Sequence, residues 1–202
     1  TAGKERIIAF NKSDLSDPVE NDRWIEFLLD QNITAIPLNS NRGDGIDKMI
    51  NTLNKVVTKG GRALRIMTVG VPNVGKSSLI NRLTKRKSTK VGDRPGVTKG
   101  KQWLTLDNGM MLLDTPGILW PKFEDPEVGL NLAFCGSIKD EILDTQDLAF
   151  ELIKVLEKDY PQKLIERYKL DEITDDTLTN MEAIAMKRGF ILPGKRIEYE
   201  RT

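Results

Sequence analysis

An eight-residue stretch, residues 70–77 with the sequence GVPNVGKS, fits the pattern G-x-x-x-x-G-K-[ST] and restricts the fold more than any other feature of the chain. It follows an apolar run at 64–69 and precedes a helical pattern at 78–83. Its glycines let backbone N–H groups curl around phosphate oxygens, and the helix start adds its positive dipole end. The sequence therefore predicts a phosphate loop, with Lys76 on the β- and γ-phosphates and the Ser77 hydroxyl on Mg²⁺.

Strand and helix patterns alternate over the first part of the chain. Strands are predicted at 6–10, 33–38, 64–69, 102–106 and 110–113, and helices at 21–30, 46–57 and 78–83. The Asn-Gly pair at 108–109 predicts a hairpin between the last two strands. This alternation is typical of an α/β domain with a mostly parallel sheet. From about Pro126 the patterns are helical, so we expect an α/β domain at 1–124 and an all-helical domain at 125–202.

Residues 11–14, with the sequence NKSD, end the first predicted strand and fit the pattern N-K-x-D. The Asp14 carboxylate can accept hydrogen bonds from the ring N–H and the exocyclic amine of guanine, whereas adenine offers neither donor there. Lys12 would lay its stem along the base, and Asn11 would bridge to neighbouring loops. Alone, the motif resembles a helix N-cap; beside a phosphate loop, it indicates a guanine nucleotide.

Asn39 and Ser40 also follow a predicted strand. Two interpretations remain open for them. Their backbone N–H groups could reach the guanine oxygen, or residues 39–45 form only a turn.

The motif D-T-P-G at 114–117 ends the last predicted strand. Asp114 would hold Mg²⁺ through water, and the Gly117 N–H would contact the γ-phosphate. Between this motif and the phosphate loop, residues 92–100 predict a mobile loop in which Thr98 would close on Mg²⁺ when the γ-phosphate is present. A plain solvated loop is the alternative for these residues.

The residue after Gly117 is Ile118, where Ras-like enzymes carry a glutamine that orients the attacking water. The chain also contains no histidine. We therefore expect slow intrinsic hydrolysis, with the water positioned by a missing N-terminal segment, an ion or a partner. Asn73 either holds a potassium ion against the phosphates or only shapes its loop.

The motifs run in a rotated order, from the base-reading motif to the phosphate-reading ones, and a rotated chain can close the same site. This order, with GVPNVGKSS at 70–78 and DTPGI at 114–118, resembles the circularly permuted GTPases, and among them the ribosome biogenesis GTPase A family. The stretches at 125–133, 136–140, 168–171 and 187–189 resemble the same family.

The resemblance implies a P-loop fold with a circularly permuted, Ras-like GTPase domain and a helical C-terminal domain that contacts ribosomal RNA. It also implies a potassium-stimulated GTPase acting late in assembly of the large ribosomal subunit. An apolar residue replaces the catalytic glutamine in that family, as Ile118 does here. The family's further strand and histidine-bearing N-terminal segment are absent from this sequence, so we expect the chain to be a fragment whose beginning is missing.

A basic cluster extends from the end of the helix predicted at 78–83, which follows the phosphate loop, through the mobile loop predicted at 92–100. It comprises Arg82, Lys85, Arg86, Lys87, Lys90, Arg94, Lys99 and Lys101. The cluster either tracks RNA phosphates or is a solvated helix end. The whole chain is nearly neutral, with 31 Lys+Arg against 30 Asp+Glu, so net charge does not choose between these interpretations.

The single cysteine fits a reducing compartment, and no apolar run reaches the roughly 18 residues of a membrane span. We expect a bacterial cytoplasmic protein without a membrane partner, an organelle matrix being the alternative. The expected function is a GTPase switch; the competing one is a nucleotide-gated RNA-binding module with little hydrolysis.

The expected site residues form three sets. Those for GTP are Asn11, Lys12, Ser13, Asp14, Asn39, Ser40, Asn73, Val74, Gly75, Lys76, Ser77, Ser78 and Gly117. The catalytic residues are Lys76, Thr98 and Gly117, and the metal ligands are Ser77, Thr98 and Asp114 for Mg²⁺ and Asn73 for K⁺.

Overall fold

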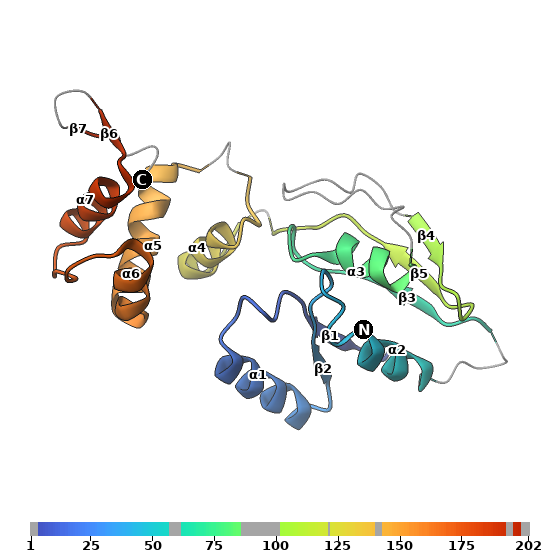
Figure 1. Ribbon diagram of the computed structural model, residues 1–202. Helices are drawn as coiled ribbons and strands as arrows, with labels where there is room; N and C mark the ends of the chain where they lie inside the picture. Colours follow the sequence, from blue (N-terminus) through green and yellow to red (C-terminus); the bar gives the residue numbers. More distant parts are fainter. Residues whose placement is uncertain are drawn as a thin grey trace. The chain divides into compact units, whose positions relative to one another are not determined.

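Two units make up the computed structural model, one spanning Thr1–Pro121 and the other Lys122–Thr202. The structure describes residues 4–56, 62–85, 102–120, 122–139, 143–192 and 196–198 (Figure 1). Among these residues, no helix is long and apolar enough to cross a membrane.

The first unit contains two small sheets built from apolar runs. In one, β1 (Ile7–Phe10) pairs in parallel with β2 (Thr34–Pro37). In the other, β5 (Met111–Asp114) lies between β3 (Arg65–Met67), which is parallel to it, and β4 (Gln102–Thr105), which is antiparallel. The Asn-Gly hairpin is present between β4 and β5, with Gly109 at φ 81°. The parallel pairs need long crossovers, which the helices supply.

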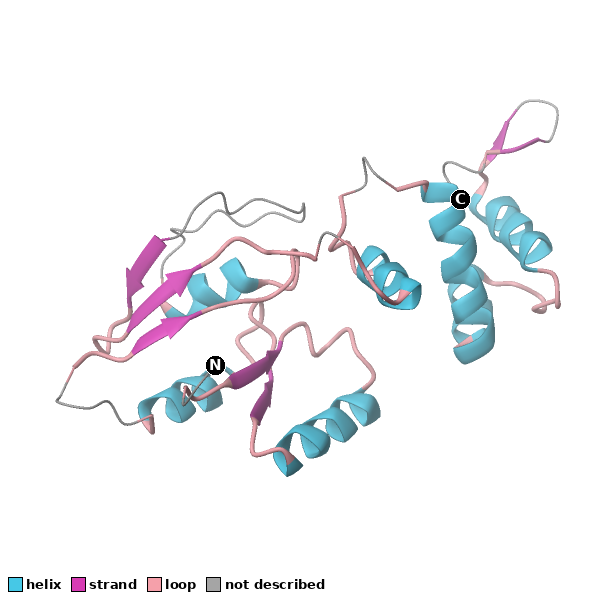
Figure 2. Cartoon of the chain, turned by 180° about the vertical axis from the view of Figure 1, so that it is seen from behind, coloured by secondary structure: helices cyan, strands magenta, loops and turns pink. Residues whose placement is uncertain are grey.

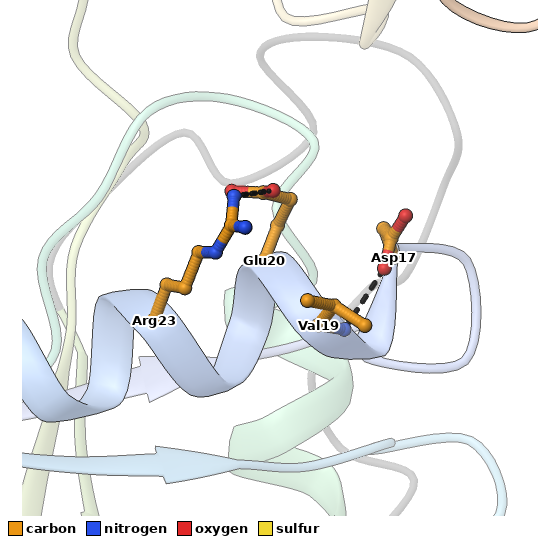
Figure 3. Close-up of polar contacts among 4 residues, drawn as sticks. All are labelled: Asp17, Val19, Glu20 and Arg23. Carbon is orange, nitrogen blue, oxygen red and sulfur yellow. Dashed lines mark hydrogen bonds and ion pairs between the residues drawn. The ribbon is translucent and has the colours of Figure 1, made fainter.

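Residues 15–17 separate the N-K-x-D motif from helix α1 (Pro18–Asp30). The Asp17 carboxylate accepts a hydrogen bond from the Val19 N–H at 2.8 Å (Figure 3). Pro18 lies in the first turn of the helix. On the exposed side, Glu20 and Arg23 form an ion pair at 2.6 Å (Figure 3). Because Asp17 caps the start of α1, the helix does not extend back into the N-K-x-D motif, and the motif remains a loop.

The apolar stripe of α1 is only partly buried. Trp24, Phe27 and Leu28 recur at helical spacing, but only Leu28 of the three is buried, whereas Trp24 is 56 % and Phe27 54 % exposed. The two aromatic rings contact each other edge to face, with centroids 5.7 Å apart. Periodicity thus located the helix but not the extent of its buried face.

Helices α2 (Ile46–Asn54) and α3 (Lys76–Leu83) supply the apolar side chains that cover the strands. Ile80 and Leu112 are almost fully buried in this core, which also includes Ile36 and Leu38 of the β1–β2 region. Helix α3 packs against β5 (Figures 1 and 2). This core therefore fixes α3, the helix that follows the phosphate loop, relative to β3, the strand that precedes it.

The second unit is mainly helical. Its elements are α4 (Pro126–Phe134), α5 (Thr145–Asp159), α6 (Pro161–Tyr168), α7 (Thr177–Arg188) and the short antiparallel strands β6 (Ile191–Leu192) and β7 (Arg196–Ile197). The sequence patterns did not predict this strand pair. A core of Ile153, Leu164, Met181 and Ile184 joins α5, α6 and α7.

One buried amide fixes α7 in this unit. The Asn180 side chain donates to the Glu157 carboxylate at 2.8 Å and to the Thr174 carbonyl at 2.7 Å, and accepts from the Thr174 N–H at 2.9 Å. Because every polar group of the amide is paired, its burial is compatible with a stable core.

Candidate nucleotide site

Asn11 joins three loops that lie far apart in the sequence. Its side-chain NH₂ group donates to the Val74 carbonyl at 2.9 Å and to the Gly75 carbonyl at 3.3 Å. Its side-chain oxygen accepts from the Ser40 N–H at 3.0 Å and from the Ser40 hydroxyl at 2.9 Å. The N-K-x-D motif, the phosphate loop and the loop after β2 therefore meet at one amide, which agrees with the bridging role expected for Asn11.

The other residues of the N-K-x-D motif differ in environment. Lys12 is half-buried with φ 58°, a left-handed backbone that turns the chain sharply after β1. The Ser13 hydroxyl and N–H both donate to the Leu38 carbonyl, at 3.1 and 3.2 Å. Asp14 is exposed. The motif thus keeps its carboxylate accessible while its neighbours anchor it to the end of β2.

The loop after β2, residues 39–44, is called the second base loop below. The Asn39 side-chain oxygen accepts from the N–H groups of Asn41 and Arg42, at 2.9 and 3.0 Å. Asn39 and Ser40 are each 5 % exposed. The predicted turn is therefore present, and its N–H groups from Asn39 to Arg42 all donate within the protein. The contact to the guanine oxygen stays a prediction.

The phosphate loop closes tightly around Gly75. This residue has φ 86°, and a Cβ atom added to it would lie 2.2 Å from the Asn11 side-chain nitrogen. Glycine is therefore required both by the left-handed backbone and by the Asn11 amide. Asn73 also has a left-handed backbone, at φ 59°. Helix α3 starts at Lys76, with Ser77 and Ser78 half-buried in its first turn.

The D-T-P-G motif lies against the phosphate loop. A Cβ atom added to Gly117 would approach the Pro72 backbone to 2.7 Å and the Lys76 ammonium to 2.9 Å. The Thr115 hydroxyl donates to the Thr68 carbonyl, a contact that the sequence patterns did not predict. The two expected phosphate-sensing segments are therefore adjacent.

Lys76 and Asp114 form the charged centre of the site. The Lys76 ammonium donates to the Val71 carbonyl at 2.7 Å. Burial lowers the pKa of Lys76, and the charge of Asp114 opposes that change. Burial likewise raises the pKa of Asp114, and the charge of Lys76 and the Thr115 backbone N–H oppose that rise. Asp114 is 1 % exposed, and no hydrogen bond of normal geometry to either of its carboxylate oxygens is present among the described residues.

An unpartnered buried carboxylate fits a magnesium site, because a hard cation bound through water would satisfy its oxygens. Among the described residues, no group of three His, Cys, Asp or Glu side chains could hold a metal alone. A magnesium ion held here would need further oxygen ligands, such as those of nucleotide phosphates and water. Asp114 and the Ser77 hydroxyl are the described residues that would hold the ion.

Replacing Asp114 by Asn is expected to preserve or raise the stability of the nucleotide-free protein, while weakening Mg²⁺–GTP binding about tenfold or more. The raised pKa means that the folded protein retains a proton that the unfolded chain has lost. Stability of the parent should therefore fall as pH rises from about 4 through the raised pKa, and Asp114→Asn should lack this fall. Chemical unfolding across this pH range and Mg²⁺-dependent nucleotide titration test both effects.

Asp107→Asn is the matched control. It removes the same charge from an exposed carboxylate that pairs with Lys85 at 3.0 Å, and it should alter neither measurement appreciably. A clear loss of nucleotide-free stability in Asp114→Asn, with unchanged Mg²⁺–GTP affinity, would contradict a metal-holding role.

Several of the expected functional residues lie outside the part of the chain that the structure describes. Thr98 lies outside the described residues, as do six members of the basic cluster: Arg86, Lys87, Lys90, Arg94, Lys99 and Lys101. Ile118 is described and is 74 % exposed. Of the two described basic residues, Lys85 pairs with Asp107, and the Arg82 guanidinium donates to the carbonyls of Ser40 and Asn41. No sequence pattern predicted this role for Arg82.

A phosphate loop between a strand and a helix, with an N-K-x-D loop bound to it through Asn11, defines a P-loop GTPase domain. The order of its motifs along the chain is circularly permuted.

Two family models match the chain. One is described as a 50S ribosome-binding GTPase and matches residues 65–185; the other is described as RsgA GTPase and matches residues 1–124. Ribosome biogenesis GTPase A of Bacillus cereus is 44 % identical, over 98 % of this chain and 71 % of that protein. The Priestia megaterium protein of the same name is 42 % identical, over 98 % and 73 %.

Among solved structures, the GDP-bound YlqF from Thermotoga maritima superimposes with a TM-score of 0.69. It is 30 % identical, and the match covers 99 % of this chain and 75 % of that one. The chain belongs to the ribosome biogenesis GTPase A family. These matches confirm that the chain is a P-loop GTPase with circularly permuted motifs. They also confirm the family that the sequence resembled.

Proposed function

We propose that this GTPase acts as a nucleotide-controlled switch late in assembly of the large ribosomal subunit. The observation that carries the nucleotide part is the Asn11 junction, since it joins the base-reading and phosphate-reading loops through four hydrogen bonds. Curated relatives named ribosome biogenesis GTPase A support the assembly part. Because those relatives are bacterial, the proposed location is the bacterial cytoplasm, with an organelle matrix as the alternative.

In this proposal, GTP and GDP occupy the loops around Asn11. Asp14 reads the guanine edge, and Lys76 holds the β- and γ-phosphates. Lys76 is suited to this because burial lowers its pKa, so its ammonium gains from an anionic partner. The Gly117 N–H would contact the γ-phosphate from its position against Pro72 and Lys76. Thr98 would close on Mg²⁺ only in the GTP form.

Potassium is the proposed activator, with Asn73 as its ligand. Asn73 has a left-handed backbone, which asparagine adopts more readily than most residues other than glycine, so this geometry suits a loop-shaping role as well as an ion-binding one. Potassium would supply positive charge where Ile118 cannot supply a hydrogen bond.

Ribosomal RNA is the proposed partner of the helical unit. Lys187 and Arg188 lie in the last turn of α7, and the Arg188 guanidinium lies 5.9 Å from the centre of the Phe190 ring. Basic and aromatic groups side by side suit contact with phosphates and bases. A large-subunit precursor is the particle that would present this RNA.

A second candidate function is a nucleotide-gated RNA-binding module with little hydrolysis. The exposed Ile118 side chain favours it, because this side chain cannot orient water. The two functions differ in turnover on the ribosomal particle.

GTP turnover by the intact protein distinguishes them, measured in potassium and in sodium buffer, with and without purified large subunits. The switch is expected to turn over about a thousandfold faster with subunits in potassium, at the lower end of the range over which partners complete GTPase sites. Small subunits serve as the matched control and should not stimulate. Nucleotide binding without any stimulation would favour the RNA-binding module instead.

A further inference from the structure

Arg82, near the end of α3, reaches the second base loop. Its Nε–H donates to the Ser40 carbonyl at 2.9 Å, and one of its terminal NH₂ groups donates to the Asn41 carbonyl. The helix that starts at the phosphate loop is therefore bound at its other end to the loop that follows β2.

The Arg82 guanidinium binds one edge of two peptide units in this loop, and the Asn39 side chain binds the opposite edge of the same two units. Each peptide unit is planar, so the Ser40 carbonyl and the Asn41 N–H move together, as do the Asn41 carbonyl and the Arg42 N–H. Both N–H groups donate to the Asn39 side-chain oxygen, while both carbonyls accept from Arg82. The orientation of these two peptide units is thus determined on both edges.

The same loop is bound to the phosphate loop through Asn11. Ser40 donates to Asn11 with its N–H and hydroxyl, and Asn11 donates to Val74 and Gly75. A closed circuit results: from α3 through Arg82 to Ser40, through Asn11 to Gly75, and back into α3. Displacing the second base loop would therefore require its hydrogen bonds to both Arg82 and Asn11 to break.

Arginine suits this role because its planar guanidinium presents adjacent donors in a fixed geometry. Gly43 lies beside it; a Cβ atom added there would be 3.7 Å from the guanidinium carbon. A lysine could donate to one carbonyl but could not span both with a rigid group.

We infer that Arg82 is a positioning residue for guanine-nucleotide binding, which keeps the second base loop on the phosphate helix and thereby slows nucleotide release. Arg82 acts through the loop and does not touch the reacting phosphate. The inference rests on the nucleotide site proposed above.

The test is the dissociation rate of fluorescent GDP from the intact protein and its variants. Arg82→Gln is expected to release GDP about tenfold faster, because the variant loses the charge-assisted hydrogen bonds of the guanidinium to the loop backbone. Arg82→Lys should fall between this variant and the parent, because one donor remains. Single-turnover hydrolysis at saturating GTP should be unchanged in Arg82→Gln, while the GTP concentration at half-maximal rate rises.

Arg42→Gln is the matched control. It removes the same charge from the second base loop, where Arg42 contributes its backbone N–H to the turn. Its GDP release should stay close to that of the parent. Unfolding midpoints of all variants show whether each is folded at the assay temperature.

Two outcomes would overturn the inference: parental GDP release from folded Arg82→Gln, or equal acceleration by Arg42→Gln, which would reduce the effect to general charge. A parent protein that fails to bind GDP would instead refute the proposed nucleotide site itself, so the two failures are distinguishable.

Discussion

Replacing Asp14 by Asn should move nucleotide preference from GTP toward xanthosine triphosphate by about 10⁴-fold, because a site built to pair a polar group rejects a ligand that lacks the partner. The Asp14 carboxylate can accept both N–H donors of guanine, whereas the Asn amide presents one acceptor and one donor. Xanthine carries a carbonyl in place of the exocyclic amine, so the Asn side chain can pair with it. The exposed position of Asp14 leaves the carboxylate free to meet a base.

Competition binding with GTP, xanthosine triphosphate and ATP measures this preference. Asp22→Asn is a suitable control, since it removes an exposed carboxylate from the nearby helix α1. Parental GTP affinity in Asp14→Asn would mean that Asp14 does not read the base.

Replacing Asn11 by Ala is expected to weaken GDP and GTP binding about a hundredfold and to lower stability. Four hydrogen bonds disappear, and the Ser40 N–H and the Val74 carbonyl lose partners in a half-buried environment. Each such loss costs about 1 kcal/mol, and unpaired buried groups cost more. The three loops would also lose their common junction, so part of the cost is paid when nucleotide orders them.

Nucleotide titration and chemical unfolding measure the two effects separately. Asn21→Ala makes the same substitution where the amide forms only a local bond to the Ser16 hydroxyl, at 2.7 Å. That control should retain parental nucleotide affinity. If Asn11→Ala bound GDP as tightly as the parent, the junction would not organise the site.

The main elements of the fold could be predicted from local pattern. Apolar runs located β1, β2 and β3, and the Asn-Gly pair predicted the hairpin between β4 and β5. Errors arose at the ends: α3 begins at Lys76 rather than at 78, since Gly75 already supplies the left-handed turn that precedes it. Boundaries depend on such backbone detail, which periodicity does not contain.

The sequence by itself determined the class of this protein. Phosphate-binding glycines, the N-K-x-D motif and the D-T-P-G motif are local chemical patterns, and their order along the chain revealed the permutation. Each motif consists of a few adjacent residues, so it can be recognised in the sequence without knowledge of its tertiary contacts.

Only the tertiary structure decided which distant residues each motif contacts. Asn11 bonds to residues 63 and 64 positions away, and Arg82 to residues 42 and 41 positions away. The burial of the Asp114 side chain is likewise a property of the folded chain. Long-range contacts and burial depend on how distant segments pack, because no local pattern encodes the identity of a partner brought close by folding.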